Sequence, residues 1–96
     1  MKGSNEKTLK EALAGLLHDF HLEEKINERR LSESWERMFG KTIMKYTRKI
    51  YVKDKKLFLT IDSASLKQEL LFNKQKMMDR INAEIAVGMI EEIILK

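Results

Sequence analysis

The hydrophobic pattern of the first forty residues predicts two helices. Apolar side chains before residue 20 recur at three- and four-residue spacings, and Thr8 and Glu11 have the spacing of a capping box at a helix start. A second helix is expected over residues 23–39, because its acidic start and later basic residues suit the helix dipole. Its apolar stripe drifts at one five-residue spacing, which allows a bend at residues 30–32. Gly40 is expected to end it with a positive φ.

The pattern then changes to the two-residue alternation of strands, after one more helical turn over residues 41–46. Residues 48–53 and 56–62 each alternate apolar and polar side chains, as half-buried strands do. Asp54 and Lys55 between them have the length of a tight hairpin loop. Glycine normally occupies the second position of such a turn, so Lys55 would need an unfavourable positive φ. The outward face of this hairpin is expected to hold Lys49, Tyr51, Lys53 and Phe58.

The last third predicts one long helix and a final strand. The helix covers residues 63–86 and is entered through an N-cap at Asp62, Ser63 or Ser65. Leu71 and Phe72 are expected to widen its buried stripe, whose other members are Leu66, Leu70, Met77, Met78, Ile81 and Ile85. Residues 89–95 are apolar enough for a strand. The predicted order is α-α-β-β-α-β, an α+β domain over residues 8–96 behind a flexible leader of residues 1–7.

Composition restricts the class of protein. A chain of 96 residues supports one modest core, and no apolar run approaches the ~20 residues needed to cross a bilayer. The start of the chain has no secretory signal, so we expect a cytoplasmic protein without a membrane partner. The absence of cysteine excludes disulfides and thiolate metal sites. Residues 41–56 hold seven basic side chains against Asp54 alone, which favours an anionic partner such as nucleic acid.

Patterns of catalytic residues are not found. Gly40-Lys41-Thr42 resembles the end of a phosphate-binding P-loop, but Trp35 stands where that motif needs its first glycine. His18 and His21 lack the further ligands that a metal site requires. We therefore expect no enzymatic activity, no cofactor, no metal and no small-molecule substrate.

The basic run is the feature that suggests a function. Cations interleaved with aromatic side chains suit a single strand of nucleic acid, because phosphates contact the cations while bases stack on the rings of Tyr51 and Phe58. The alternative is a solvated hairpin whose lysines protect an exposed sheet edge. Trp35 lies on an apolar stripe and is interpreted as a core anchor. The candidate binding residues are Lys41, Lys45, Arg48, Lys49, Lys53, Lys55 and Lys56, with Arg29, Arg30 and Arg37 as an extension.

Motifs spread along the chain resemble the DciA family. They are Trp35-x-x-Met38-Phe39-Gly40, Leu57-x-Leu59-x-Ile61-Asp62-Ser63, Gln68-Glu69-Leu70, and Ile81-Asn82 before Ile93-x-Leu95. The resemblance implies a fold similar to the K-homology domain, with helices on one face of a three-stranded sheet. It also implies a bacterial replication protein that binds DNA and the DnaB-type replicative helicase and helps to load this helicase onto single strands.

The same resemblance implies structural roles for Trp35, Gly40 and Leu70, which would position the hairpin. Family members commonly turn this hairpin with Asp-Gly, where the chain has Asp54-Lys55. Many also carry tryptophan at the position of Leu66. Neither difference changes the expected fold.

Two other functions remain open. The chain could dock on the helicase or another replication protein through apolar surface, without touching DNA. RNA binding of the K-homology type is the other, although that class needs a Gly-x-x-Gly clamp and Gly40 is followed by Lys41, Thr42 and Ile43.

Overall fold

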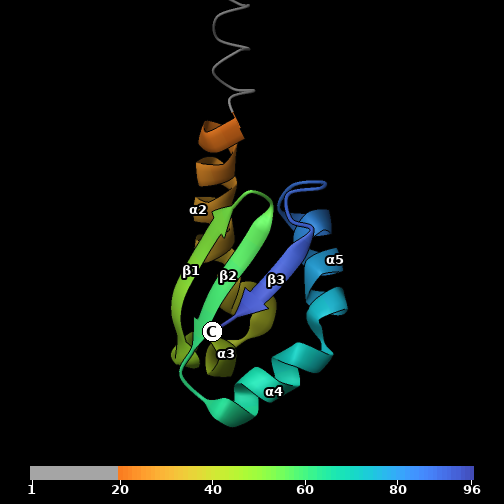
Figure 1. Cartoon of the computed structure of the whole chain (residues 1–96). Helices are drawn as coiled ribbons and strands as arrows, with labels where there is room; N and C mark the ends of the chain where they lie inside the picture. The colour runs from red at the N-terminus through yellow and green to blue at the C-terminus, as the bar shows by residue number, and fades with distance from the viewer. Residues whose placement is uncertain (1–19) are drawn as a thin grey trace, which may run out of the picture.

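The computed structural model describes residues 20–96, so the helix expected to start at Thr8 lies largely outside the described residues. The elements are α2 (Phe20–Phe39), α3 (Lys41–Tyr46), β1 (Thr47–Lys53), β2 (Lys56–Ile61), α4 (Ala64–Phe72), α5 (Lys74–Glu84) and β3 (Glu92–Leu95) (Figure 1). None of the described helices is long and apolar enough to cross a membrane.

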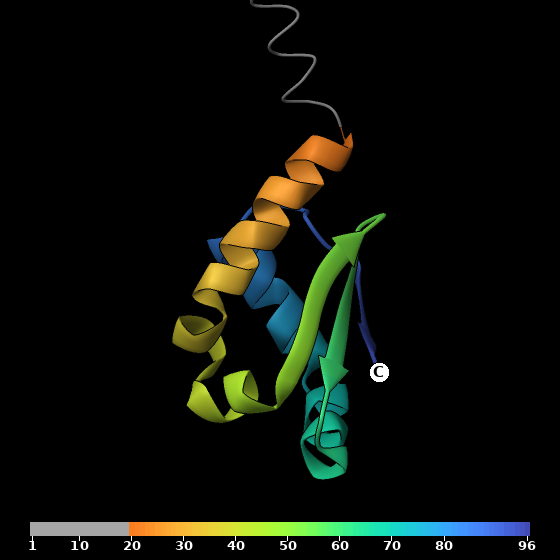
Figure 2. The same cartoon turned by 90° about the vertical axis from the view of Figure 1, so that its left-hand side faces the viewer.

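The three described strands form one mixed sheet in the order β1-β2-β3. β1 and β2 are antiparallel, with Val52 opposite Leu57, whereas β2 and β3 are parallel, with Leu57 opposite Ile93. A parallel neighbour requires a crossover connection, which α4 and α5 provide. All the described helices lie on one side of the sheet (Figure 2). None of them covers the other side, which we call the uncovered face. The predicted α+β class with helices on one face is confirmed.

The core lies between the sheet and the helices. Its fully buried side chains come from α2, the inward face of the strands, α5 and the loop before β3: Leu31, Trp35, Leu57, Leu59, Ile81, Ile90 and Ile93. Burying a side chain of this size contributes about 1.5–3 kcal/mol relative to leaving it exposed. Trp35 is 0% exposed and Leu70 is 4% exposed, so both are core residues. The alternation predicted for residues 56–62 is confirmed, because every second residue of β2 is buried. On β1 only Val52 is buried, and Ile50 is half-buried.

α2 ends at Gly40, as the sequence predicts. The helix runs without interruption through residues 30–32, so the bend considered there is not seen. Gly40 has φ +93° and ψ 167°, a combination open to glycine alone among common residues. Its N–H still donates a hydrogen bond of 2.8 Å to the carbonyl of Glu36, and α3 begins at the next residue.

The single helix predicted over residues 63–86 is wrong, because the chain forms two helices that meet at Asn73. The N–H of Asn73 donates to the carbonyl of Leu70 at 3.1 Å, and its side-chain Nδ2 donates to the carbonyl of Glu69 at 2.9 Å. These bonds satisfy carbonyls that a continuing helix would have paired along its backbone. The prediction that Leu71 and Phe72 are buried is also wrong, since at this corner they are 43% and 80% exposed.

Candidate nucleic-acid interface

The uncovered face of the sheet carries the outward side chains of the hairpin. Lys49, Tyr51 and Lys53 alternate with inward residues along β1, and Lys56 and Phe58 do so along β2. The three lysines are exposed and the two aromatic rings are half-buried. The sequence predicted correctly that Lys49, Tyr51, Lys53 and Phe58 share this face, because a strand places every second side chain on the same face.

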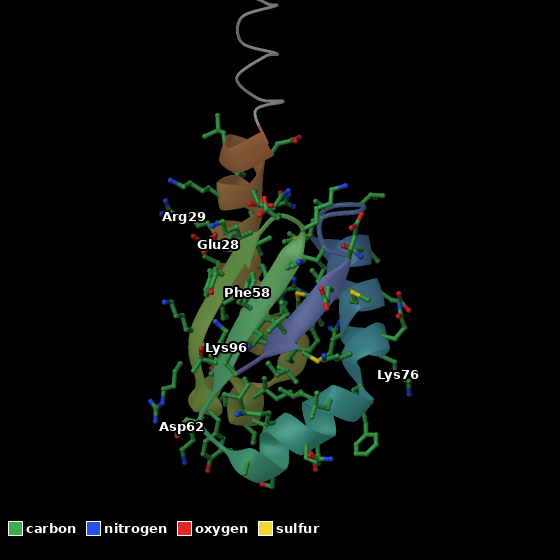
Figure 3. The ribbon with its side chains drawn as sticks, in the orientation of Figure 1. Glu28, Arg29, Phe58, Asp62, Lys76 and Lys96 are labelled. Carbon is green, nitrogen blue, oxygen red and sulfur yellow. The ribbon has the colours of Figure 1, made fainter. Side chains whose placement is uncertain are left out.

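Tyr51 and Phe58 occupy directly opposed positions of β1 and β2. Their rings stack with centroids 4.7 Å apart and planes inclined by 7°. Lys49 Nζ lies over the Tyr51 ring at 5.1 Å from its centroid, and Lys96 Nζ lies over the Phe58 ring at 5.3 Å. We call these four residues the lysine–aromatic row; Figure 3 shows Phe58 and Lys96 together on the uncovered face.

Lys96 is a member of this row that the sequence reasoning missed. Its N–H donates to the carbonyl of Leu59 at 2.8 Å, and its carbonyl accepts from the N–H of Ile61 at 3.0 Å, so it continues the ladder beyond β3. The alternation of Ile93 inward and Ile94 outward, carried two residues further, places Lys96 on the uncovered face. This alternation is the sequence feature from which the position of Lys96 could have been predicted.

The base of the hairpin loop concentrates positive charge. Lys53 and Lys56 are directly opposed in the register. Like charges at opposed positions destabilise a sheet. None of the described carboxylates forms an ion pair with either residue, or with Lys49. This arrangement leaves local positive charge uncompensated within the described part of the chain.

Two predicted binding residues beside this face are already paired with carboxylates. Arg48 contacts Asp62 Oδ2 through Nη2 at 2.7 Å and through Nε at 3.1 Å. Lys55 Nζ lies 3.8 Å from Glu91 Oε1, and the Lys55 N–H donates to Glu24 Oε2 at 3.1 Å. All these contacts are exposed, so they reduce the local charge without removing the side chains from solvent.

The other predicted residues do not join the hairpin lysines. Lys41 and Lys45 lie on α3, next to the start of β1 and at the opposite end of that strand from the loop (Figure 1). Arg30 is exposed on α2, where Arg29 pairs with Glu33 at 3.1 Å. Arg37 faces α5 on the helical side of the sheet. The structure therefore brings together Lys49, Lys53 and Lys56, and disperses the remainder.

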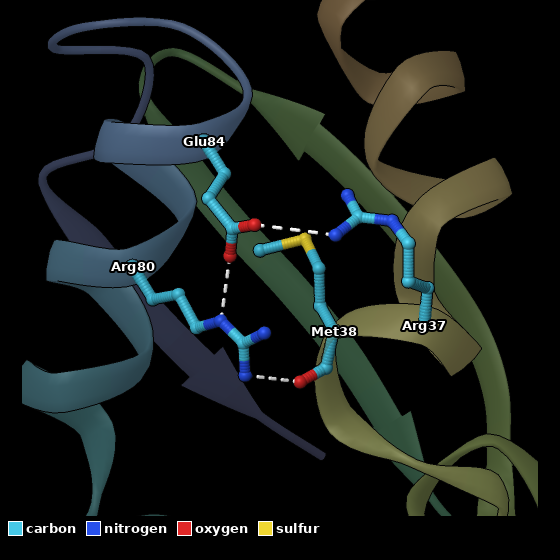
Figure 4. Close-up of polar contacts among 4 residues, drawn as sticks. All are labelled: Arg37, Met38, Arg80 and Glu84. Atoms are coloured by element: carbon cyan, nitrogen blue, oxygen red, sulfur yellow. Dashed lines mark hydrogen bonds and ion pairs between the residues drawn. The ribbon is translucent and has the colours of Figure 1, made fainter.

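Arg37 belongs to a polar clamp between α2 and α5 (Figure 4). Glu84 accepts from Arg80 Nε at 2.6 Å and from Arg37 Nη1 at 3.2 Å, while Arg80 also donates to the carbonyl of Met38. The hydrogen bond from Arg80, and after it the one from Arg37, holds the pKa of Glu84 below its ordinary value of 4.5. The clamp gives Arg37 a structural partner that the sequence reasoning did not predict.

Residues 20–96 contain no group of three or more His, Asp or Glu side chains arranged to hold a metal ion.

The described part of the chain is a small α+β domain. Helices cover one face of its sheet, and lysines and aromatic rings occupy the other face.

Comparison with protein-family models assigns this domain to a family. The family model described as "Dna[CI] antecedent, DciA" matches residues 8–95, nearly the whole chain. The chain belongs to the DciA family. Membership implies a role in loading the replicative helicase, and the family is not one of known enzymes. No curated protein and no solved structure matches the chain, so similarity to the K-homology fold stays a prediction.

Proposed function

We propose that this domain is a non-enzymatic module that binds single-stranded DNA on the uncovered face of its sheet and assists loading of a DnaB-type helicase. The observation that carries the proposal is the set of Lys49, Lys53 and Lys56, which share this face without an ion-pair partner among the described carboxylates. Uncompensated lysines on one face attract a polyanion and release its counterions on binding.

Other cations lie around this surface. Lys41 and Lys45 lie apart from it on α3, beyond the start of β1, and Lys96 adds a cation at the β3 side. Arg48 and Lys55 contribute less, because Asp62 and Glu91 offset their charge. With about five phosphate contacts, the logarithm of affinity falls with the logarithm of salt concentration at a slope of roughly 3.5.

Fluorescence anisotropy with single-stranded and duplex oligonucleotides, each at two salt concentrations, tests the DNA-binding part. Replacing Lys49, Lys53 and Lys56 by Gln removes three charges from the uncovered face, and we expect weaker binding with a shallower salt slope. The matched control replaces Lys67, Lys74 and Lys76 of α4 and α5 by Gln, for the same change in net charge. Absence of binding at low salt, or an equal loss in both variants, contradicts the proposal.

A second candidate function is docking on a protein, and the corner between α4 and α5 favours it. Leu71 and Phe72 are consecutive and exposed there, and Phe72 is 80% exposed. Adjacent exposed apolar side chains are typical of protein contacts. The partner we name is the replicative helicase.

A helicase pull-down at high salt separates docking from DNA bridging, because salt weakens phosphate contacts and leaves apolar contacts in place. We expect Phe72→Ser to lose helicase retention. The matched control is Val87→Ser, which removes another apolar side chain, 95% exposed, from the loop after α5. Equal retention of both variants excludes Phe72 as the docking residue.

A further inference from the structure

Each ring of the lysine–aromatic row has two neighbours, the other ring and one lysine ammonium group. Tyr51 and Phe58 cover each other on the side where they stack. β2 is the central strand, so the other side of Phe58 looks toward β3, where Lys96 Nζ lies over the ring. Tyr51 lies on the edge strand β1, and Lys49 of the same strand covers its ring. A base that stacked on either ring would have to displace a lysine.

Base edges are read by Arg or Lys at guanine, by Asn or Gln at adenine, by Glu or Asp at cytosine, and by Ser or Thr. The described strands hold no Asn or Gln, and their one arginine, Arg48, contacts Asp62. The outward positions of the described strands hold three lysines, two aromatic rings, Thr60, Ile94 and Glu92, and Lys96 continues this face beyond β3. Glu92 stands beside Lys56 in the register but forms no ion pair with it.

We propose that this face recognises phosphates and not bases, an inference that rests on the DNA-binding function proposed above. The Tyr51–Phe58 pair is a spacer that holds the ammonium groups of Lys49 and Lys96 at the two ends of the row. An ammonium over an aromatic face keeps its outer donors directed to solvent, where they meet phosphate oxygens. The ligand class is a single-stranded sugar–phosphate backbone of any base composition.

Binding to an abasic strand distinguishes the two modes. Anisotropy is measured with an ordinary single-stranded oligonucleotide and with one of equal length in which every base is missing, and inorganic polyphosphate is added as a competitor. We expect the two strands to bind within about twofold of each other and polyphosphate to displace both. Base stacking predicts a loss of at least about fivefold for each stacked base that is removed.

The outcomes separate the two proposals. Strong binding of the ordinary strand with weak binding of the abasic strand overturns phosphate recognition and leaves DNA binding intact. Absence of binding by both strands overturns the DNA-binding function itself.

Substitutions in the row give a second readout. Lys96→Gln should weaken the binding of both oligonucleotides by the same factor and reduce the slope of log affinity against log salt concentration by about 0.7. Lys76→Gln on α5 makes the same charge change away from this face and should leave both affinities unchanged. Tyr51→Leu should also affect both strands equally, because it loosens the position of Lys49. If Tyr51→Leu weakens the binding of the ordinary oligonucleotide alone, the Tyr51 ring stacks on bases and phosphate recognition is overturned.

Discussion

Trp35 on α2 donates a hydrogen bond of 3.0 Å from its indole Nε1 to the hydroxyl oxygen of Thr47, the first residue of β1. That hydroxyl donates in turn to the carbonyl of Ile43 on α3 at 2.6 Å. The indole is fully buried, so its one polar atom is satisfied where water is excluded. This chain of bonds joins α2, α3 and the start of the hairpin, and so sets the direction in which β1 leaves the helices.

Replacing Thr47 by Val should destabilise the fold by about 1–3 kcal/mol, because the buried indole N–H would lose its acceptor. Urea denaturation measures the change in free energy of unfolding. The matched control is Thr42→Val on α3, where the side chain is exposed. In a Trp35→Phe background the donor is already absent, so Thr47→Val should cost less. An unchanged cost in that background contradicts the role given to the bond.

A second prediction concerns Asn82, whose side chain holds the loop before β3. Its Nδ2 donates to the carbonyl of Ile90 at 2.9 Å, and its Oδ1 accepts from the N–H of Ile90 at 3.0 Å. Asn82→Asp keeps the shape but loses the donor and places a charge beside a carbonyl. We expect a loss of about 1–3 kcal/mol in the free energy of unfolding. Gln68→Glu, the same change of amide to acid at an exposed site, should change stability little; comparable losses would refute this prediction.

The hairpin and its two faces could be predicted from the sequence, whereas the break at Asn73 could not. In a half-buried strand every second side chain points into the core, and residues 56–61 of β2 follow this pattern without exception. The spacing from Leu70 to Met77 equals about two helical turns, so it fits one helix or two. Asn73 donates hydrogen bonds from its side chain and its N–H at the break, and such bonds leave no periodic pattern in the sequence.

The candidate site shows the same difference between local and distant information. Lys49, Tyr51, Lys53 and Phe58 share a face because of strand geometry, and they were predicted together. Arg37 was also included, but its partner Glu84 lies 47 positions away. Asp62, which offsets Arg48, lies 14 positions away. Charge counted along the sequence does not reveal such partners, because they meet only after folding.

The clamp at Glu84 leads to a pH prediction. The folded pKa of this carboxyl is lowered, so its stabilising effect is present above its unfolded pKa and is lost as the pH falls through the folded pKa. We therefore expect Glu84→Gln to lower the melting temperature at pH 7. The difference from the unchanged protein should shrink as the pH falls below about 4. Thermal unfolding followed by circular dichroism between pH 7 and pH 3 measures this convergence.

The control for Glu84 is Glu69→Gln, an exposed carboxylate that forms no ion pair with another described residue. Its melting temperature should follow that of the unchanged protein across the range. A Glu84→Gln difference that stays constant down to pH 3 would show that charge at Glu84 is not what joins α2 to α5.

The last prediction uses the strain in the hairpin loop. Asp54 and Lys55 have φ +52° and +60°, as a two-residue type I′ turn requires, and Lys55 is a residue that rarely adopts this conformation. Lys55→Gly relieves the strain and gives the unfolded chain more freedom, so we expect a net gain of up to about 1 kcal/mol. The lost contact with Glu91 is exposed and 3.8 Å long, and the bond from the Lys55 N–H to Glu24 is retained because it uses the backbone. Lys56→Gly, where β2 is extended, should instead destabilise, and urea denaturation of both variants decides whether turn strain or loss of a lysine governs the change.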